Sequence, residues 1–268
     1  TVAQAMLAKV YAEKEVQDYD KVITYADKVI KTKGVELEDS YETLWGYDET
    51  TKDCLKRNTK EGILEVHWTT GGGNWETWMF GRQLDNWDFY FTWAKWITPS
   101  RDIISDFEKE GDEIRKNQAI VYYACTWSNY YPASHYPFMY KLRSSYSNIY
   151  WIRLADIILM KAEAEAYKGN LDESAKLVNQ IRKRAKLKEL TSDKTNSTEA
   201  MIEAVLHERR LELAFEGEHW FDLCRNNKVE KYLNGIDNRD NGRIKQVKQF
   251  DSNSYLLPIP PVSYTHLT

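Results

Sequence analysis

Two stretches of this chain, 152 residues apart, carry the side-chain pattern of a helical hairpin, and this pattern constrains the fold most. In residues 2 to 30, apolar side chains mark two helix faces on either side of a polar connector, and the second face recurs at i, i+3, i+4, i+7 and i+8. A similar pattern returns from residue 159 to residue 185. The matching pairs at this offset are Leu7 and Leu159, Lys9 and Lys161, Ala12 and Ala164, Glu13 and Glu165, and Asp20 and Asp172.

Small residues on the first helix, a short turn and an alanine-bearing second helix are typical of a tetratricopeptide-like hairpin. The two copies are divergent and not in tandem, so they do not predict a regular solenoid. Two unrelated antiparallel helix pairs are the alternative that periodicity alone leaves open. We expect Gly34 to end the second helix of the first pair as its C-cap.

A third helix is predicted from Glu199 to Glu216, with Thr198 or Ser197 placed to cap its first turn. Its apolar stripe consists of Ile202, Val205, Leu206 and Leu213. Arg209 falls on this stripe, and a guanidinium that faces a core needs a carboxylate. We expect Glu212 or Glu216 to be that partner, and we interpret Glu208, Arg209 and Arg210 as part of a structural ion-pair network.

Residues 35 to 147 hold few long periodic runs and much of the aromatic content. Six of the ten tryptophans fall between positions 68 and 96. Residues 61 to 68 alternate like a short strand, and the apolar residues after Pro99 predict another helix. Residues 256 to 261 predict an extended, proline-stiffened strap.

The aromatic run from residue 74 to residue 96 has two interpretations. As core, its rings bury large areas and need partners only for their N–H and O–H groups. As a binding surface, ring faces offer flat apolar platforms to the C–H faces of sugars, while nearby amide and charged groups bond the hydroxyls. We expect most of the rings to pack and two or three to be exposed. The candidate glycan-binding residues are Asn74, Trp75, Trp78, Arg82, Asp85, Trp87 and Tyr90.

Catalysis by a carboxylate pair is an alternative for the same segment. Glycosidases place two carboxyl groups beside the sugar, and Glu76 with Asp85 or Asp88 supplies such a pair. Because 29% of the chain is charged, acidic residues beside an aromatic cluster are also expected by chance.

Charge and motifs exclude several classes of function. With 37 Lys and Arg against 41 Asp and Glu, the net charge is −4, and no basic footprint for nucleic acid is present. No GxSxG, HExxH or P-loop motif occurs. The three cysteines and five histidines show no metal-ligand spacing, and we interpret residues 237 to 242 as a turn rather than a calcium loop. We therefore expect no metal and no cofactor.

Residues 151 to 164 and 208 to 223 resemble the two signature stretches of the SusD/RagB-like family of outer-membrane nutrient-binding lipoproteins. Supporting matches are Pro99-Ser100, residues 112 to 115, Lys141 and residues 257 to 260. The residues that carry the structural motif are Arg153, Glu163, Glu208, Arg209, Arg210, Glu212, Glu216, Trp220 and Asp222. We expect Trp151 and Trp220, which lie inside these stretches, to be core residues.

The resemblance implies an all-α fold of tetratricopeptide-like hairpins with long irregular loops, the SusD-like α-α superhelix. It covers residues 1 to 268 as one domain: a hairpin (1–34), an aromatic loop-rich segment (35–147), and a second hairpin, the signature helix and the strap (148–268). The chain starts where the middle of the family starts, so we interpret it as an N-terminally truncated member, and residues 262 to 268 do not resemble the usual family ending.

The resemblance also implies a function. Family members bind oligosaccharides, or in some cases peptides, at the outer surface of the bacterial outer membrane. They pass them to a SusC-like TonB-dependent transporter without chemistry, and their membrane attachment is an N-terminal lipid anchor that this chain lacks. We therefore predict a non-catalytic glycan-binding subunit; the alternatives are an α-helical glycoside hydrolase and a pure protein–protein adaptor.

Overall fold

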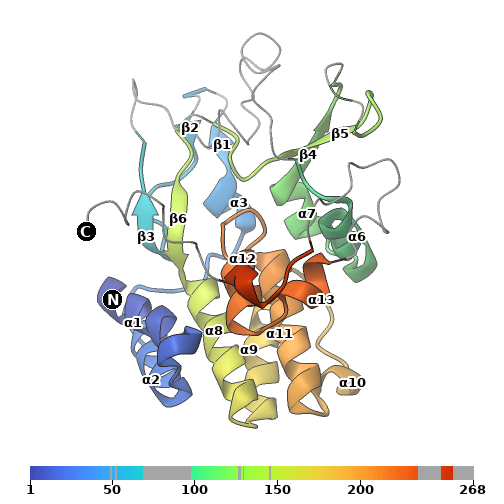
Figure 1. Cartoon of the computed structure of the whole chain (residues 1–268). Helices are drawn as coiled ribbons and strands as arrows, with labels where there is room; N and C mark the ends of the chain where they lie inside the picture. The colour runs from blue at the N-terminus through green and yellow to red at the C-terminus, as the bar shows by residue number, and fades with distance from the viewer. Residues whose placement is uncertain are drawn as a thin grey trace, which may run out of the picture. The chain divides into compact units, whose positions relative to one another are not determined.

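The computed structural model describes residues 1–48, 50–51, 53–68, 98–125, 128, 130–144, 146–234 and 249–255. The chain divides into two compact units, Thr1–His219 and Trp220–Thr268. The described part of the first unit is mainly helical, with short strand pairs (Figure 1). No helix among the described residues is long and apolar enough to cross a membrane.

Two helical hairpins form the base of the first unit. The first consists of α1 (Val2–Ala12) and α2 (Tyr19–Ile30), joined by a 3₁₀ turn (Lys14–Val16), and the second of α8 (Leu154–Tyr167) and α9 (Leu171–Arg184). The predicted repeat is confirmed by its starting points, because Val2 and Leu154, like Tyr19 and Leu171, are 152 residues apart. Helix α8 packs between α2 and α9, and Figure 1 shows these helices side by side.

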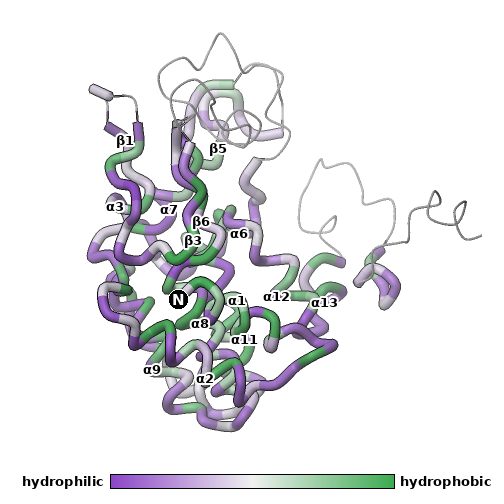
Figure 2. Tube along the Cα trace, turned by 90° about the vertical axis from the view of Figure 1, so that its left-hand side faces the viewer, coloured by the Kyte–Doolittle hydropathy of each residue, from purple (hydrophilic) through white to green (hydrophobic). Residues whose placement is uncertain are grey.

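Helix α8 is buried around its whole circumference from Leu154 to Ala166. It is apolar on more than one face, and its alanines let neighbouring backbones approach closely. Helix α11 (Thr198–Glu212) packs against both α8 and α9, and α10 (Ser192–Thr195) precedes it. The core of this unit includes Ala5 of α1, Ile152 of β6 and Ile157 of α8, and Figure 2 shows hydrophobic segments in these three elements.

The ends of the predicted helices agree with the structure in part. The Ser197 side chain accepts a hydrogen bond from the backbone N–H of Ala200, which confirms the predicted cap of α11. The C-cap prediction for Gly34 is wrong: α2 ends at Ile30, and Lys31 is its C-cap. The Thr32 hydroxyl donates to the carbonyl of Lys28, so the last turn is satisfied before the chain reaches Gly34.

The described residues between 35 and 153 contribute short helices and three antiparallel strand pairs. The helices are α3 (Tyr41–Trp45), α6 (Arg101–Glu110) and α7 (Glu113–Ala119). The strand pairs are β1 (Tyr47–Asp48) with β2 (Asp53–Cys54), β3 (Gly62–Val66) with β6 (Ile149–Arg153), and β4 (Ile120–Tyr123) with β5 (Tyr136–Met139). The predicted strand at 61–68 and the helix after Pro99 are confirmed, whereas the β4–β5 hairpin has no counterpart in the sequence-based expectations.

The second unit is small in its described part. Helix α12 (His219–Arg225) crosses the boundary between the units and is followed by α13 (Val229–Leu233) and a 3₁₀ turn (Ser252–Tyr255). The Asn234 side chain bonds both the N–H and the carbonyl of Phe250, at 2.8 and 2.9 Å. These two hydrogen bonds connect the two described segments of the unit.

Candidate functional site

The predicted glycan-binding residues lie outside the described part of the chain. They are Asn74, Trp75, Trp78, Arg82, Asp85, Trp87 and Tyr90, together with the carboxylates Glu76 and Asp88. The turn at 237–242 and the strap at 256–261 lie outside it as well.

The structure does describe the two ends of the segment that carries these residues. On one side, the Trp68 carbonyl accepts a hydrogen bond of 2.9 Å from the Arg57 guanidinium. On the other, the Thr98 hydroxyl donates to the carbonyl of Pro137 in β5, at 2.8 Å. The aromatic segment is therefore attached at both ends to the first unit, next to strands β3 and β5.

A buried ion-pair network in the first unit contains four of the nine predicted motif residues, Arg153, Glu208, Glu212 and Glu216. Its cations are Arg115, Lys141, Arg153, Arg182 and Arg184, and its anions are Glu61, Asp112, Glu208, Glu212 and Glu216. Because the cations and anions are equal in number, the network brings no net charge into the core. It joins elements that are far apart in sequence, from the start of β3 to the end of α11.

Arg153 occupies the centre of this network because β6 passes directly into α8 at this residue. Its guanidinium contacts Glu216 at 2.6 Å, Glu61 at 2.8 Å and Glu212 at 2.6 Å. It also donates to the main-chain carbonyl of Glu212 at 2.7 Å. The fork geometry of arginine allows these simultaneous contacts, which a lysine cannot reproduce.

Among the carboxylates of this network, Glu212 contacts the largest number of guanidinium groups. It accepts from Arg153 at 2.6 Å, Arg184 at 2.5 Å and Arg115 at 3.1 Å, and from the Tyr41 hydroxyl at 2.5 Å. Burial raises its pKa, but the three guanidinium groups outweigh burial and hold the pKa well below its usual range. This carboxylate therefore stays charged and serves as a structural anchor.

The prediction for the partner of Arg209 is wrong. Arg209 is fully buried, as expected, but it pairs with Asp156 at 2.7 Å, and Glu212 and Glu216 bind the network instead. Lys9 of α1 also contacts Asp156, at 2.7 Å. Burial raises the pKa of Asp156, but Lys9 and Arg209 together lower it below its usual value. This second cluster ties the first hairpin to α8 and α11.

Most of the remaining motif residues form ion pairs with other residues of the described chain. Glu208 bridges Arg115 at 2.7 Å and Arg182 at 2.9 Å, and Arg210 pairs with Asp106, so the interpretation of residues 208 to 210 as an ion-pair network is confirmed. Glu163 is buried in α8, and Asp222 pairs with Arg225 inside the second unit.

Two expected core tryptophans are exposed. Trp151 is 63% exposed, because it occupies the outward-facing position of β6 between the buried Tyr150 and Ile152. Trp220 is 36% exposed and packs in a tilted arrangement against Phe250, with ring centroids 5.8 Å apart. The prediction that both are core residues is therefore wrong.

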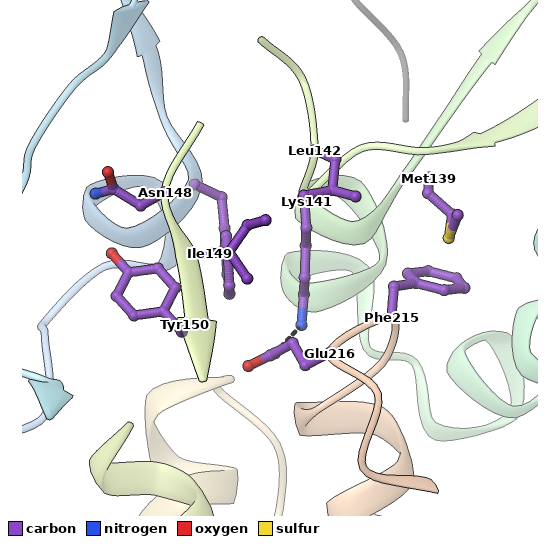
Figure 3. Close-up of a pocket in the computed structure, with 9 residues that line it drawn as sticks. Met139, Lys141, Leu142, Asn148, Ile149, Tyr150, Phe215 and Glu216 are labelled. Atoms are coloured by element: carbon purple, nitrogen blue, oxygen red, sulfur yellow. Dashed lines mark hydrogen bonds and ion pairs between the residues drawn. The ribbon is translucent and has the colours of Figure 1, made fainter. Parts of the chain in front are cut away.

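A pocket of about 210 Å³ lies where β5, β6, α3 and the turn after α11 meet (Figure 3). Its walls are mostly apolar. They comprise Trp45, Met139, Lys141, Leu142, Asn148, Ile149, Tyr150, Phe215 and Glu216. Figure 3 shows the Lys141 ammonium pointing at Glu216, the pair that links this pocket to the buried network.

The polar groups of this pocket are held in place. The Lys141 ammonium contacts Glu216 at 2.5 Å, donates to the Glu212 carbonyl at 3.0 Å and lies 4.9 Å from the centroid of the Trp45 ring. Burial lowers its pKa, and Glu216 offsets only part of that effect. Because Glu216 is also bound by Arg153, the pair is fixed from both sides.

Two aromatic residues of the pocket have unusual local features: Phe215 has a strained backbone, and Trp45 has a hydrogen-bond donor that is unsatisfied among the described residues. Phe215 has a φ of 66°, a left-handed conformation that bulky residues rarely adopt. Trp45 is only 5% exposed, and its indole N–H has no acceptor within the described residues. The pocket thus has aromatic and mainly apolar walls. Its lining comes from four separate chain segments, so no local pattern in the sequence indicates it.

Metal binding finds no support in the described ranges, where no three His, Cys, Asp or Glu side chains gather closely enough to hold an ion.

Comparison with known proteins places these features in a family. A family model described as the SusD family matches residues 36–263. SusD-like protein P38 of Formosa agariphila is 38% identical over 104 residues, which are 37% of this chain and 21% of that protein. A SusD superfamily protein from Bacteroides vulgatus has a TM-score of 0.71 at 23% identity, covering 98% of this chain and 60% of that one. Surface glycan-binding protein A from Bacteroides thetaiotaomicron has a TM-score of 0.68 at 17% identity, covering 98% and 61%.

The chain belongs to the SusD family, because the family model matches most of its length. The all-α architecture of tetratricopeptide-like hairpins is shared with the two solved structures, which confirms the predicted fold class. The chain covers 60% and 61% of the length of these two structures.

Proposed function

We propose that this protein binds oligosaccharides without catalysis at the bacterial cell surface and delivers them to a SusC-like TonB-dependent transporter. The observation that carries the proposal is the SusD family match over residues 36–263. The name of the similar B. thetaiotaomicron protein, surface glycan-binding protein A, supports a glycan as the ligand class.

The ligand contacts of this proposal come from the aromatic segment between β3 and α6. Trp75, Trp78, Trp87 and Tyr90 supply stacking platforms, and Asn74, Arg82 and Asp85 bond sugar hydroxyls. The described frame is suited to this role, because both ends of the segment are hydrogen-bonded to a unit whose core is cross-linked by the buried network.

The experiment that tests this proposal measures glycan binding and glycan hydrolysis on the same samples. The 268-residue chain is titrated by calorimetry with a panel of neutral and acidic oligosaccharides and of short peptides, and each mixture is then assayed for released reducing sugar. We expect saturable binding of at least one glycan and no release. Reducing-sugar release that disappears in Asp85→Asn would instead establish the hydrolase, and binding of no soluble ligand by a chain that captures the transporter would establish an adaptor.

Delivery to the transporter needs a separate experiment. The full-length protein and the SusC-like protein from the same bacterium are co-purified in detergent with and without the bound glycan. We expect a stable complex in both conditions. A glycan-binding protein that never co-purifies with the transporter would contradict the delivery step while leaving glycan binding intact.

A further inference from the structure

A second pocket, of about 470 Å³, lies in the first unit at the C-terminal ends of α6 and α9, beside α10. We name it the lysine pocket. It is lined by Lys109, Glu110, Gly111, Arg182, Lys186, Leu187, Lys188, Glu189, Leu190, Thr191 and Lys194. Its volume is within the range of about 300–1,000 Å³ that is usual for sites of small organic ligands.

The charge of the lysine pocket is opposite to that of the chain. Five cationic side chains line it against the two carboxylates Glu110 and Glu189, whereas the whole chain has a net charge of −4. Within the described ranges, none of the four lysine ammonium groups forms an ion pair with a carboxylate. Such a concentration of unpaired positive charge in a concave surface attracts anions.

The arginine of the pocket is already neutralised, so the lysines carry the excess. Arg182 contacts Glu110 at 3.0 Å and Glu208 at 2.9 Å. Glu110 also bonds His207 at 3.1 Å, and this bond together with Arg182 lowers the pKa of Glu110 to about 2. Arg182 is therefore shared between two carboxylates and adds no unpaired positive charge to the pocket.

Helix dipoles account for only part of the lysine excess. The C-terminal ends of α6 and α9 each carry about half a negative charge, which favours cations nearby. Lys109 and Lys186 flank these two ends. Lys188 and Lys194 lie beyond the last turn of α9, so the dipoles leave them uncompensated.

The chemistry of the lining selects a particular kind of ligand. Among the described residues, no aromatic ring lines the pocket, so its described lining offers no platform for sugar stacking. Leu187 and Leu190 offer apolar contact, Thr191 offers a hydroxyl, and the lysines offer charge. A sugar ring that carries an oxyanion matches all three.

We propose that the lysine pocket binds the sulfate or carboxylate groups of an anionic oligosaccharide. This inference rests on the proposed glycan-binding function but uses none of the residues of the aromatic segment. It makes the protein a binder that distinguishes charged from neutral glycans through the lysine pocket.

The test compares a sulfated oligosaccharide with its chemically desulfated form, using the 268-residue chain and calorimetry at low and high NaCl. The variant Lys188→Glu/Lys194→Glu reverses the charge of two pocket lysines. It leaves Lys186 unchanged, because the backbone of Lys186 has a left-handed conformation that a substitution could disturb. The control Lys33→Glu/Lys176→Glu makes the same change of charge at exposed lysines outside the pocket.

We expect the sulfated ligand to bind the wild-type chain and the control more tightly than the desulfated ligand, by about fivefold or more at low salt. The pocket variant loses this preference, its affinity for the desulfated ligand is unchanged, and salt reduces the preference in the wild type. Equal affinity for both ligands, or a preference that survives in the pocket variant, would overturn the proposal.

Two further outcomes separate this proposal from others. If the desulfated ligand binds and sulfate adds no affinity, only the proposal for the lysine pocket is refuted. If neither ligand binds, the proposed glycan-binding function is refuted as well. Inorganic sulfate and vesicles that contain anionic lipid are run in parallel. If the pocket variant loses binding to either of these probes but keeps its preference for the sulfated glycan, the pocket serves a different anion and the proposal is wrong.

Discussion

Replacing Glu212 by glutamine removes one negative charge from the most widely shared carboxylate of the buried network. The side chain is fully buried and contacts Arg153, Arg184 and Arg115 at 2.6, 2.5 and 3.1 Å. Glutamine keeps the shape and one oxygen acceptor, so the change isolates charge from packing. The five cations of the network are then opposed by four carboxylates.

The expected cost follows from the burial of the uncompensated charge. Removing one partner of a buried ion pair destabilises a protein by about 3–5 kcal/mol. A loss of that size lowers the melting temperature by about 6–20 °C for a chain of this length. The matched control is Asp20→Asn, because Asp20 is 76% exposed and pairs with Lys168 at the surface, where an ion pair contributes about 0–1 kcal/mol.

Thermal and urea unfolding, followed by circular dichroism, measure both variants at pH 7. We expect Glu212→Gln to unfold about 6–20 °C below the wild type and Asp20→Asn to unfold within about 4 °C of it. A loss below about 1 kcal/mol in Glu212→Gln would refute the reasoning, because it would mean that the other four carboxylates compensate the guanidinium groups without Glu212.

Three further predictions concern packing, capping and pH. Ile157→Ala in the buried helix α8 costs about 2–5 kcal/mol, whereas Met6→Ala, at a side chain that is 52% exposed on α1, costs less than about 0.5 kcal/mol; urea unfolding that ranks them in the reverse order would contradict the described burial. Ser197→Ala removes the cap of α11 and costs about 1 kcal/mol, with Ser197→Asp as the variant expected to retain stability. The bond from His207 and the charge of Arg182 depress the pKa of Glu110 from 4.5 to about 2. Its stabilising contribution is therefore complete above pH 4.5 and lost as the pH falls towards 2. Melting temperatures between pH 5 and pH 2.5 are thus expected to fall more steeply for the wild type than for Glu110→Gln, and parallel curves would count against this assignment.

The helices were predictable because their signals are local. Periodic apolar residues, the cap at Ser197 and the matching hairpins lie within runs of 10 to 30 residues, and the structure has the hairpins at the same 152-residue offset. The partner of Arg209 was not predictable in this way. A search along the same helix leads to Glu212 and Glu216, whereas the actual partner, Asp156, is 53 residues away in sequence.

Trp151 shows a second limit of the sequence patterns. The family-like stretch from residue 151 to residue 164 suggests one buried unit, but β6 ends and α8 begins inside it. Alternation along the strand turns Trp151 outward between two buried neighbours. The two pockets are a third case, since each is assembled from separate parts of the chain, whereas the aromatic segment is a continuous run that stays a prediction.

The central claim, that the aromatic segment binds a glycan, is tested most directly by one calorimetric comparison. The variant Trp75→Ala/Trp78→Ala/Trp87→Ala is titrated with the best-bound oligosaccharide beside the wild type and the control Trp151→Ala, which removes an exposed tryptophan outside the segment. Stacking contributes about 1–2 kcal/mol per ring, so we predict at least a hundredfold loss of affinity in the triple variant and none in the control. Unchanged affinity in a folded triple variant would contradict the account.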